Sequence, residues 1–287
     1  GPGNFLRDVI GSHRVPTIQL TEIFRQAQQS DIVMNAHAVN AGQMPVPSRA
    51  DGDFFWLKRT DPGTVIETVA QLCATRLPNH YGFSPSQIQV LSPAKRQGSG
   101  TVALNRRLQE ALNPPAKTKL EKRFGDWVFR EGDRVMQVRN NYDIVWERGE
   151  DGEQGMGMFN GDVGEILRIF PQQECMTIRF DDRVATYTYD MLGELELAYA
   201  VTVHKSQGSE FDAVVLALSD GLPRRLLTRN ILYTAITRAK QLLVIVGSQD
   251  TVTYMVGNNQ LGRRYSALKV RMRAEAAPDA PNVPQIG

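Results

Sequence analysis

The sequence predicts an α/β fold in which a parallel sheet is interrupted by a small all-β barrel. Up to about residue 125, short apolar strands alternate with amphipathic helices, a pattern typical of a parallel sheet covered by helices. Short, partly alternating strands separated by Gly-, Asp- and Asn-rich turns follow, and the α/β pattern returns after Glu194. With 287 residues, 41% of them hydrophobic, the chain is long enough for two compact units or for one large unit with an insertion.

Residues 1–125 form the first predicted α/β part, and their alternation favours a RecA- or Rossmann-like sheet. Residues 18–42 predict a short strand and then a helix, because apolar residues recur at helical spacing up to a glycine stop. The later expected elements are a strand over 53–57, a helix over 62–77 and a buried strand over 88–91, with the polar loop 92–100 (SPAKRQGSG) after it.

Residues 126–193 predict the inserted barrel. Asn160-Gly161-Asp162 is a strong turn signal, and the very polar segment 147–155 (ERGEDGEQG) predicts a mobile loop. The expected strands of the barrel are 127–138, 162–170, 176–180 and 185–189.

Residues 194–273 predict the second α/β part, and the Pro- and Ala-rich residues 274–287 predict a disordered tail. The stretch 195–200 (LELAYA) predicts a strand or strand edge, and residues 199–207 predict a short helix that Gly208 ends. The remaining expected elements are a buried strand over 213–218, a helix over 222–239 and a buried strand over 241–246.

Charge and cysteine usage limit the possible function classes. The net charge of +2 does not indicate a nucleic-acid partner by itself, but residues 92–123 hold eight Lys and Arg against two Glu. That excess predicts either a solvated face or an electrostatic track for phosphates. Cys73 and Cys175 show neither CxxC spacing nor clustered His, so neither a zinc site nor a disulfide framework is indicated. Because no apolar run of membrane length and no signal peptide are visible, the sequence predicts a cytoplasmic protein without a membrane partner.

The chain has no complete motif for nucleotide hydrolysis. No GxxxxGK[ST] phosphate loop occurs, and no apolar strand ends in paired acids suited to Mg²⁺. A Rossmann-type cofactor enzyme is disfavoured as well, because no GxGxxG follows a predicted strand.

Three polar clusters could still carry chemistry, and each has a structural alternative. Phe24-Arg25-Gln26 also fits an ordinary amphipathic helix, and the loop 92–100 fits a plain surface loop about as well as a phosphate contact. In YTAITRAK (233–240), Arg238 follows an apolar helix, so it either complements the helix dipole or reaches a phosphate from another lobe.

Together with a fourth polar stretch, residues 203–212, and in this order along the chain, the three clusters become specific. FRQ (24–26), SPAKRQG (92–98), VHKSQGSEFD (203–212) and YTAITRAK (233–240) resemble the second motor lobe of superfamily 1 DNA helicases. The most similar branch is the RecD-like 5′→3′ helicases, which include the TraA-type conjugation helicases. The resemblance covers residues 4–273 and implies a RecA-like lobe with an inserted SH3-like barrel, which agrees with the β-rich stretch noted above.

The resemblance implies a role in nucleotide binding for one set of residues. Arg25 and Arg238 match the two arginines that reach the γ-phosphate, and arginine fingers of this kind stabilise the charge that develops during phosphoryl transfer. Gln26, Gly208 and Glu210 match positions on the nucleotide side. The implied cofactor is ATP with Mg²⁺, and no metal ligand is expected in this chain.

The resemblance implies that a second set of residues binds single-stranded DNA. Its members belong to two segments, the loop after residue 91 and the predicted helix that begins near Tyr199, whose N-terminus would favour a phosphate. These residues are Ser92, Lys95, Arg96, Thr202, His204 and Lys205.

The family's first lobe, which carries the Walker A loop, the Mg²⁺ ligands and the catalytic base, has no counterpart in this sequence. The resemblance therefore implies an N-terminal helicase lobe of the same protein as a partner, besides single-stranded DNA and a recombination or repair complex. It also implies that the chain alone neither hydrolyses ATP nor unwinds DNA. The alternative is a free-standing, non-catalytic DNA-binding or adaptor module.

Overall fold

The computed structural model of the chain describes residues 5–18, 29–149, 152–259 and 271. The chain divides into two compact units, residues 1–27 with 260–287 and residues 28–259. The described part of the first unit contains helix α1 (Phe5–Ser12). The strand expected early in 18–42 and the expected tail 274–287 lie largely or wholly outside the described residues.

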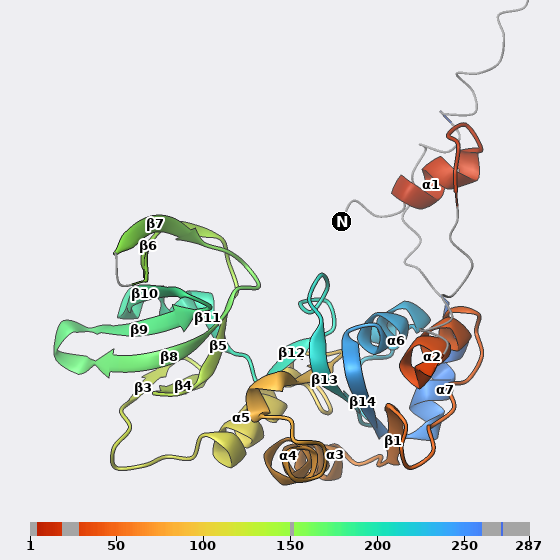
Figure 1. The fold of residues 1–287 in the computed structure, drawn as a ribbon, viewed down its shortest axis with the longest axis horizontal. Coiled ribbons are helices and arrows are strands. Elements are labelled where there is room, and N and C mark those ends of the chain that lie inside the picture. The colour runs from red at the N-terminus through yellow and green to blue at the C-terminus, as the bar shows by residue number, and fades with distance from the viewer. Residues whose placement is uncertain (1–4, 19–28, 150–151, 260–270, 272–287) are drawn as a thin grey trace, which may run out of the picture. The chain divides into compact units, whose positions relative to one another are not determined.

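A five-stranded parallel sheet organises the α/β part of the second unit (Figure 1). Its strands are β1 (Phe54–Lys58), β2 (Ile88–Ser92), β12 (Ala200–Thr202), β13 (Phe211–Leu218) and β14 (Ala239–Gly247). The spatial order is β1-β14-β13-β2-β12, and every neighbouring pair is parallel. This order, in which neighbours in space are not neighbours in sequence, confirms the α/β fold class.

Helices cover both faces of the parallel sheet. They are α2 (Asp31–Asn40), α3 (Pro62–Gln71), α4 (Leu77–Tyr81), α5 (Thr101–Leu112), α6 (Arg229–Ile236) and α7 (Gln249–Gly257). In β13, Ala213 and Val215 join the core shared with α3 and α5, whereas Val214 and Leu216 join the core shared with α2, α6 and α7. This alternation is what a strand buried on both faces requires.

The inserted part is antiparallel. A seven-stranded sheet has the order β11-β5-β8-β9-β10-β6-β7, and β3 and β4 form a separate hairpin. The strand bounds are β3 (Glu121–Phe124), β4 (Trp127–Arg130), β5 (Arg134–Gln137), β6 (Asn141–Arg148), β7 (Glu153–Met158), β8 (Val163–Phe170), β9 (Cys175–Phe180), β10 (Arg183–Thr188) and β11 (Leu195–Leu197).

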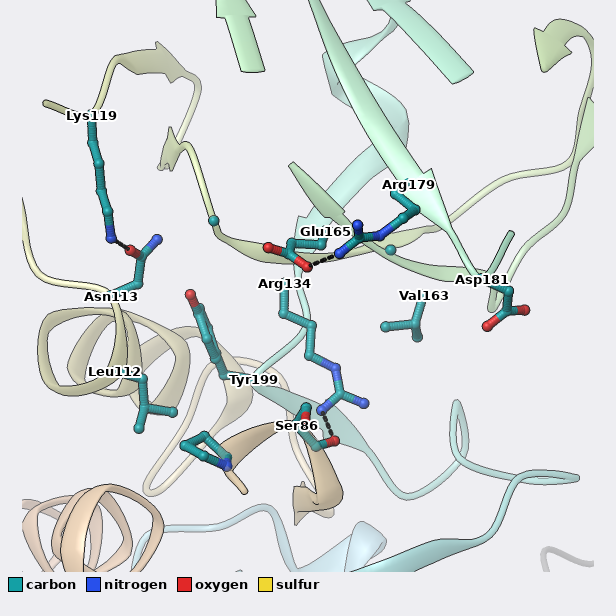
Figure 2. Close-up of a pocket in the computed structure, with 13 residues that line it drawn as sticks. Ser86, Leu112, Asn113, Lys119, Arg134, Val163, Glu165, Arg179, Asp181 and Tyr199 are labelled. Carbon is teal, nitrogen blue, oxygen red and sulfur yellow. Dashed lines mark hydrogen bonds and ion pairs between the residues drawn. The ribbon is translucent and has the colours of Figure 1, made fainter. Parts of the chain in front are cut away.

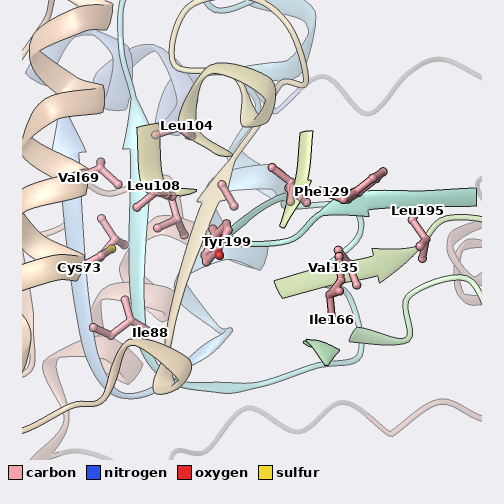
Figure 3. Close-up of a cluster of buried hydrophobic side chains, with 14 of the residues drawn as sticks. Val69, Cys73, Ile88, Leu104, Leu108, Phe129, Val135, Ile166, Leu195 and Tyr199 are labelled. Atoms are coloured by element: carbon pink, nitrogen blue, oxygen red, sulfur yellow. The ribbon is translucent and has the colours of Figure 1, made fainter. Parts of the chain in front are cut away.

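The core beneath α3 and α5 continues into this antiparallel part. Figure 3 shows Val69 and Leu108 on the helical side and Phe129, Val135 and Ile166 on the antiparallel side of one buried cluster. Burial of all these side chains removes apolar surface from water on both sides of the junction. The two parts therefore pack as one body.

A buried carboxylate strengthens the junction. The Asp133 side chain is fully buried and accepts hydrogen bonds from Gln109 of α5 and from Asn113, the residue that follows this helix. It also accepts from the backbone N–H of Arg130 (2.7 Å) and from the hydroxyl of Tyr199 (2.9 Å). Burial raises the pKa of Asp133, although these donors oppose the shift. Asp133 thus links α5, β4 and the segment that enters β12.

Several expected elements differ from the observed ones in the antiparallel part. The single strand expected over 127–138 is interrupted by a turn in which Gly132 has φ +84° and Asp133 N–H donates to the Arg130 carbonyl (2.9 Å). The expectation of a mobile loop over 147–155 is wrong for both ends of this segment, because residues 147–148 of β6 pair with residues 153–154 of β7. Arg148 stabilises these ends by ion pairs with Glu153 (3.6 Å) and Asp182 (3.0 Å).

Two expectations for the second α/β part are also wrong. The strand in 195–200 pairs with β5 in the antiparallel sheet, so the return to the α/β part comes later than residue 194. The helix expected over 222–239 shortens to α6, because Pro223 precedes a 3-10 turn and the Thr228 side chain caps a new start at Ile231 N–H.

Candidate functional site

Two loops that the sequence links to DNA leave the parallel sheet side by side. β2 and β12 are parallel neighbours with Thr202 opposite Ser92, so the residues after both strands emerge at the same, carboxyl edge. The Val203 N–H donates to the Ser92 carbonyl (3.0 Å), which ties the start of the second loop to the first. The structure therefore brings together two clusters that are more than 100 residues apart in sequence.

The helix expected over 199–207 is wrong. Residues 200–202 are the edge strand β12, and 203–208 form successive turns in which Lys205 N–H donates to the Thr202 carbonyl (2.9 Å) and Gln207 N–H to the His204 carbonyl (3.4 Å). Pairing with β2 gives the β12 backbone its hydrogen-bond partners, so no helix N-terminus is present here to attract a phosphate. Gly208 has φ +91° with open space around it, as a glycine that ends a turn requires.

Lys95 and Lys205 converge on one carboxylate. The Lys95 ammonium donates to Glu196 Oε1 (2.6 Å), and the Lys205 ammonium lies 3.4 Å from Glu196 Oε2. Glu196 belongs to β11 of the antiparallel sheet, so residues from three segments meet at this point. Glu196 is not predicted from the sequence, because a single acid in a short strand carries no recognisable signal.

The other residues predicted to contact DNA differ in exposure. Ser92 is fully buried and its Oγ accepts from the Ala94 N–H (3.3 Å), so it shapes the loop and does not present a hydroxyl at the surface. Arg96 is 76% exposed and pairs weakly with Asp126 at 3.6 Å. His204 is exposed and Thr202 half-buried at the same edge.

Arg238 lies at the opposite edge of the sheet. Ala239, the first residue of β14, pairs with Phe211 of β13, which places Arg238 beside Ser209 and Glu210 at the amino edge. The guanidinium donates to the Ser209 carbonyl (2.8 Å) and to the Thr234 carbonyl in the last turn of α6 (3.3 Å). The second contact is the one expected of a cation that complements a helix C-terminus.

Residues 203–210 therefore connect the two edges. This segment begins beside the Lys95 loop and ends against Arg238, within a connection of eight residues. Among the described ion pairs, none joins Glu210 to Arg238. Arg25 and Gln26, the other residues predicted on the nucleotide side, lie outside the described residues.

A buried asparagine, which the sequence did not predict as a site residue, fixes the entry to β12. Asn105 of α5 donates to the carbonyls of Leu197 (2.8 Å) and Ala200 (2.9 Å) and accepts from the Ala200 N–H (2.7 Å). A polar residue on the buried face of an amphipathic helix was its only signal in the sequence. These three bonds satisfy backbone groups that would otherwise be buried without partners.

One large cleft does not contain the predicted site residues. It has a volume of about 620 Å³ and lies between α5 and the antiparallel sheet, with Tyr199, Glu165 and Arg179 in its wall (Figure 2). Arg134 points into it and donates to the Ser86 carbonyl (3.3 Å), and burial lowers the pKa of its guanidinium. Across the described ranges, the structure contains no group of three His, Cys, Asp or Glu that could hold a metal and no helix long and apolar enough to span a membrane.

Both cysteines in the sequence are free thiols. Cys73 is buried, and burial raises its pKa to about 12. Such a thiol is a poor nucleophile.

Two family models match the chain. Residues 104–180 match the SH3 domain of ATP-dependent RecD-like DNA helicases, and residues 197–246 match the UvrD-like helicase C-terminal domain. The first match covers most of the antiparallel part, and the second contains β12, Arg238 and the segment between the two edges. The two matches show that the chain corresponds to the C-terminal portion of a RecD-like helicase.

Two curated relatives of this RecD-like chain carry RecD names. The ATP-dependent RecD2 DNA helicase of Deinococcus radiodurans is 33% identical over 260 residues, which are 90% of this chain and 32% of that protein. The RecBCD enzyme subunit RecD of Mycobacterium tuberculosis is 34% identical over 42% of this chain and 20% of that protein. The RecD-like chain thus spans about a third or less of the length of these relatives. A solved structure of two coordinating Pif1 helicases at forked DNA is 18% identical, covers 79% of this chain and 49% of that chain, and has a TM-score of 0.42.

The loop of the RecD-like chain that holds Lys95 depends on a glycine. A Cβ at Gly100 would lie 2.7 Å from the Lys95 carbonyl oxygen and 2.9 Å from the Arg96 nitrogen, both backbone atoms. We expect Gly100→Ala to lower the free energy of unfolding by about 1–3 kcal/mol, because the loop must shift away from α5. Urea unfolding measures the effect. Gly257→Ala, where a Cβ meets nothing within 4 Å, is the control and should leave the free energy of unfolding unchanged.

Proposed function

We propose that this chain is the C-terminal motor lobe of an ATP-dependent 5′→3′ DNA helicase or translocase. In this proposal the carboxyl edge of the parallel sheet grips single-stranded DNA through Lys95, Arg96, Thr202, His204 and Lys205. The observation that carries the proposal is the segment 203–210, which begins at this edge and ends against Arg238 at the other. Because this one segment contacts both edges, it can couple nucleotide binding at one edge to DNA binding at the other.

The DNA contacts are proposed from charge, exposure and position. Lys95, Arg96 and His204 project from neighbouring loops, and lysine and arginine side chains on loops of this kind bind backbone phosphates with little dependence on sequence. Ser92 contributes by ordering the first loop through its bond to Ala94 N–H. If these side chains bind phosphates, the affinity for single-stranded DNA should fall steeply as the salt concentration rises.

The nucleotide side is proposed from Arg238, with Gly208 and Glu210 near it and with Arg25 and Gln26 from the part outside the described residues. Bound ATP with Mg²⁺ would supply the γ-phosphate and the charge that these arginines stabilise. Arg238 has the chemistry that this needs, because rotation away from the Ser209 carbonyl would free its Nη1 donor for a phosphate oxygen. In the proposal, the Walker A loop and the Mg²⁺ ligands come from an N-terminal lobe of the same protein, and this chain alone has no ATPase activity.

The DNA grip can be tested on this chain directly. We expect the double variant Thr202→Ala with His204→Ala to bind a labelled oligothymidylate about tenfold more weakly at matched salt, because two contacts to charged phosphates are removed. Fluorescence anisotropy titrations measure the affinity. The control, Thr253→Ala with His80→Ala, removes the same side-chain types from exposed positions on α7 and α4 and should bind like the unmodified chain. Equal affinity of both double variants would contradict the proposed grip.

A further inference from the structure

Glu196 occupies the place between the two lysines of the proposed DNA grip. The Lys95 and Lys205 side chains are 48% and 31% exposed, so both can reach solvent, yet each directs its ammonium to the Glu196 carboxylate, at 2.6 and 3.4 Å. The Glu196 side chain is only 20% exposed. Two cations from different loops therefore share one anion that this chain itself provides.

The space around this carboxylate is too small for a second anion. The crevice that Lys95, Thr202, Lys205 and Glu196 help to line has a volume of about 20 Å³. That is roughly the space of one water molecule. A phosphate group cannot enter this crevice while both ammonium groups stay where they are.

The three groups differ in how easily they can move. Glu196 is fixed on β11, where its backbone pairs with Met136 of β5 and its neighbours Leu195 and Leu197 are buried. Lysine side chains, in contrast, consist of a flexible four-carbon chain with the charged ammonium group at its end. Separation of the two partners is therefore a movement of the lysines away from a stationary carboxylate.

We propose that Glu196 is an internal competitor for a backbone phosphate, so that single-stranded DNA binds at Lys95 and Lys205 only by taking both ammonium groups from this carboxylate. This inference rests on the proposed function, since it takes the two lysines as DNA contacts. A carboxylate and a phosphate offer lysine the same kind of acceptor, an anionic oxygen, so one can replace the other. Glu196 then lowers the affinity of the grip, which favours release of the strand.

The test compares two Glu→Gln variants of this chain. Glu196→Gln keeps the size of the side chain and removes its charge, and we expect about tenfold tighter binding of oligothymidylate at low salt, because two partly exposed ion pairs no longer compete. The plot of log affinity against log salt should also become steeper by about 0.7, the value for one more phosphate contact to a single strand. Glu147→Gln is the control, since it changes the net charge equally from an exposed position on β6. Glu196→Ala should act like Glu196→Gln, and thermal unfolding of both checks that they are folded.

The outcomes separate the inference from the proposed function. If Glu196→Gln binds no more tightly than Glu147→Gln, or more weakly than the unmodified chain, Glu196 does not compete with the phosphate and the inference is wrong. Adding Lys95→Ala or Lys205→Ala to Glu196→Gln should remove the gain in affinity. If these lysine changes have no effect with either residue at position 196, the lysines are not DNA contacts, and the proposed DNA grip fails with the inference.

Discussion

Replacing Arg238 by alanine is expected to lower ATP turnover about a thousandfold in a polypeptide that joins this chain to a lobe with a Walker A loop. The reason is that an arginine finger stabilises charge that develops only in the transition state of phosphoryl transfer. Single-strand affinity should stay within about twofold, because Arg238 lies at the amino edge of the sheet and the proposed DNA contacts lie at the carboxyl edge. Steady-state phosphate release and anisotropy titrations measure the two quantities.

The controls address the structural bonds of Arg238. Its donation to the Thr234 carbonyl stabilises the end of α6. Arg238→Ala should therefore also lower the free energy of unfolding, by less than the roughly 1 kcal/mol that is typical of a lost helix cap. Arg238→Lys keeps a cation near the helix end and should recover stability more than turnover, because lysine lacks the planar fork of donors. Arg225→Ala, an exposed arginine before α6, should leave turnover unchanged. A variant with normal turnover and reduced stability would show that Arg238 is only a helix cap.

Replacing Asp133 by alanine is expected to lower the free energy of unfolding of this chain by about 3 kcal/mol. The change removes a buried acceptor from four donors, among them the Tyr199 hydroxyl and the Arg130 N–H, and leaves them without their best partner. Because Asp133 joins α5 to the antiparallel part, the loss should also loosen the entry to β12. Urea unfolding followed by circular dichroism measures the change, and amide hydrogen exchange of residues 195–202 reports the loosening.

The pH dependence of the same variant gives an independent check. The raised pKa of Asp133 means that the folded chain holds this proton at pH values where the unfolded chain has lost it. Stability therefore falls as pH rises from about 4 through the raised pKa, and Asp133→Ala should remove this part of the fall. Asp143→Ala, at an exposed position on β6, serves as the control and should change stability by less than about 0.5 kcal/mol. Unfolding curves for Asp133→Ala that match those of Asp143→Ala at every pH would contradict the role of Asp133.

The two edges of the parallel sheet suggest how the proposed ligands could influence each other. The backbone of 203–210 is held by Ser92 at one end and by the Arg238 guanidinium at the other. A phosphate that draws Arg238 away from the Ser209 carbonyl would release one end of this segment. Single-stranded DNA that draws Lys205 away from Glu196 would act on the beginning of the same segment. The movements of Arg238 and of Lys205 would therefore both act on the eight backbone residues 203–210.

The sequence by itself determined the fold class and the order of the motifs. Apolar strands such as 213–218 and 241–246 carry their signal locally, since strands buried on both faces are continuous apolar runs. The motif order from SPAKRQG to YTAITRAK was sufficient to indicate a RecD-like chain, which the family models confirm.

Only the tertiary structure decided the identity of the segment after Tyr199 and the partners of its charges. Residues 199–207 have a helix-compatible composition, but the edge of β2 offers backbone partners that only the folded sheet provides, so 200–202 become a strand. Similarly, residues 195–197 join β5 and thereby bring Glu196 to Lys95, about 100 positions away in the chain. Local sequence determines propensity and periodicity, whereas strand pairing and ion pairs depend on which distant segments meet, and that is a property of the whole fold.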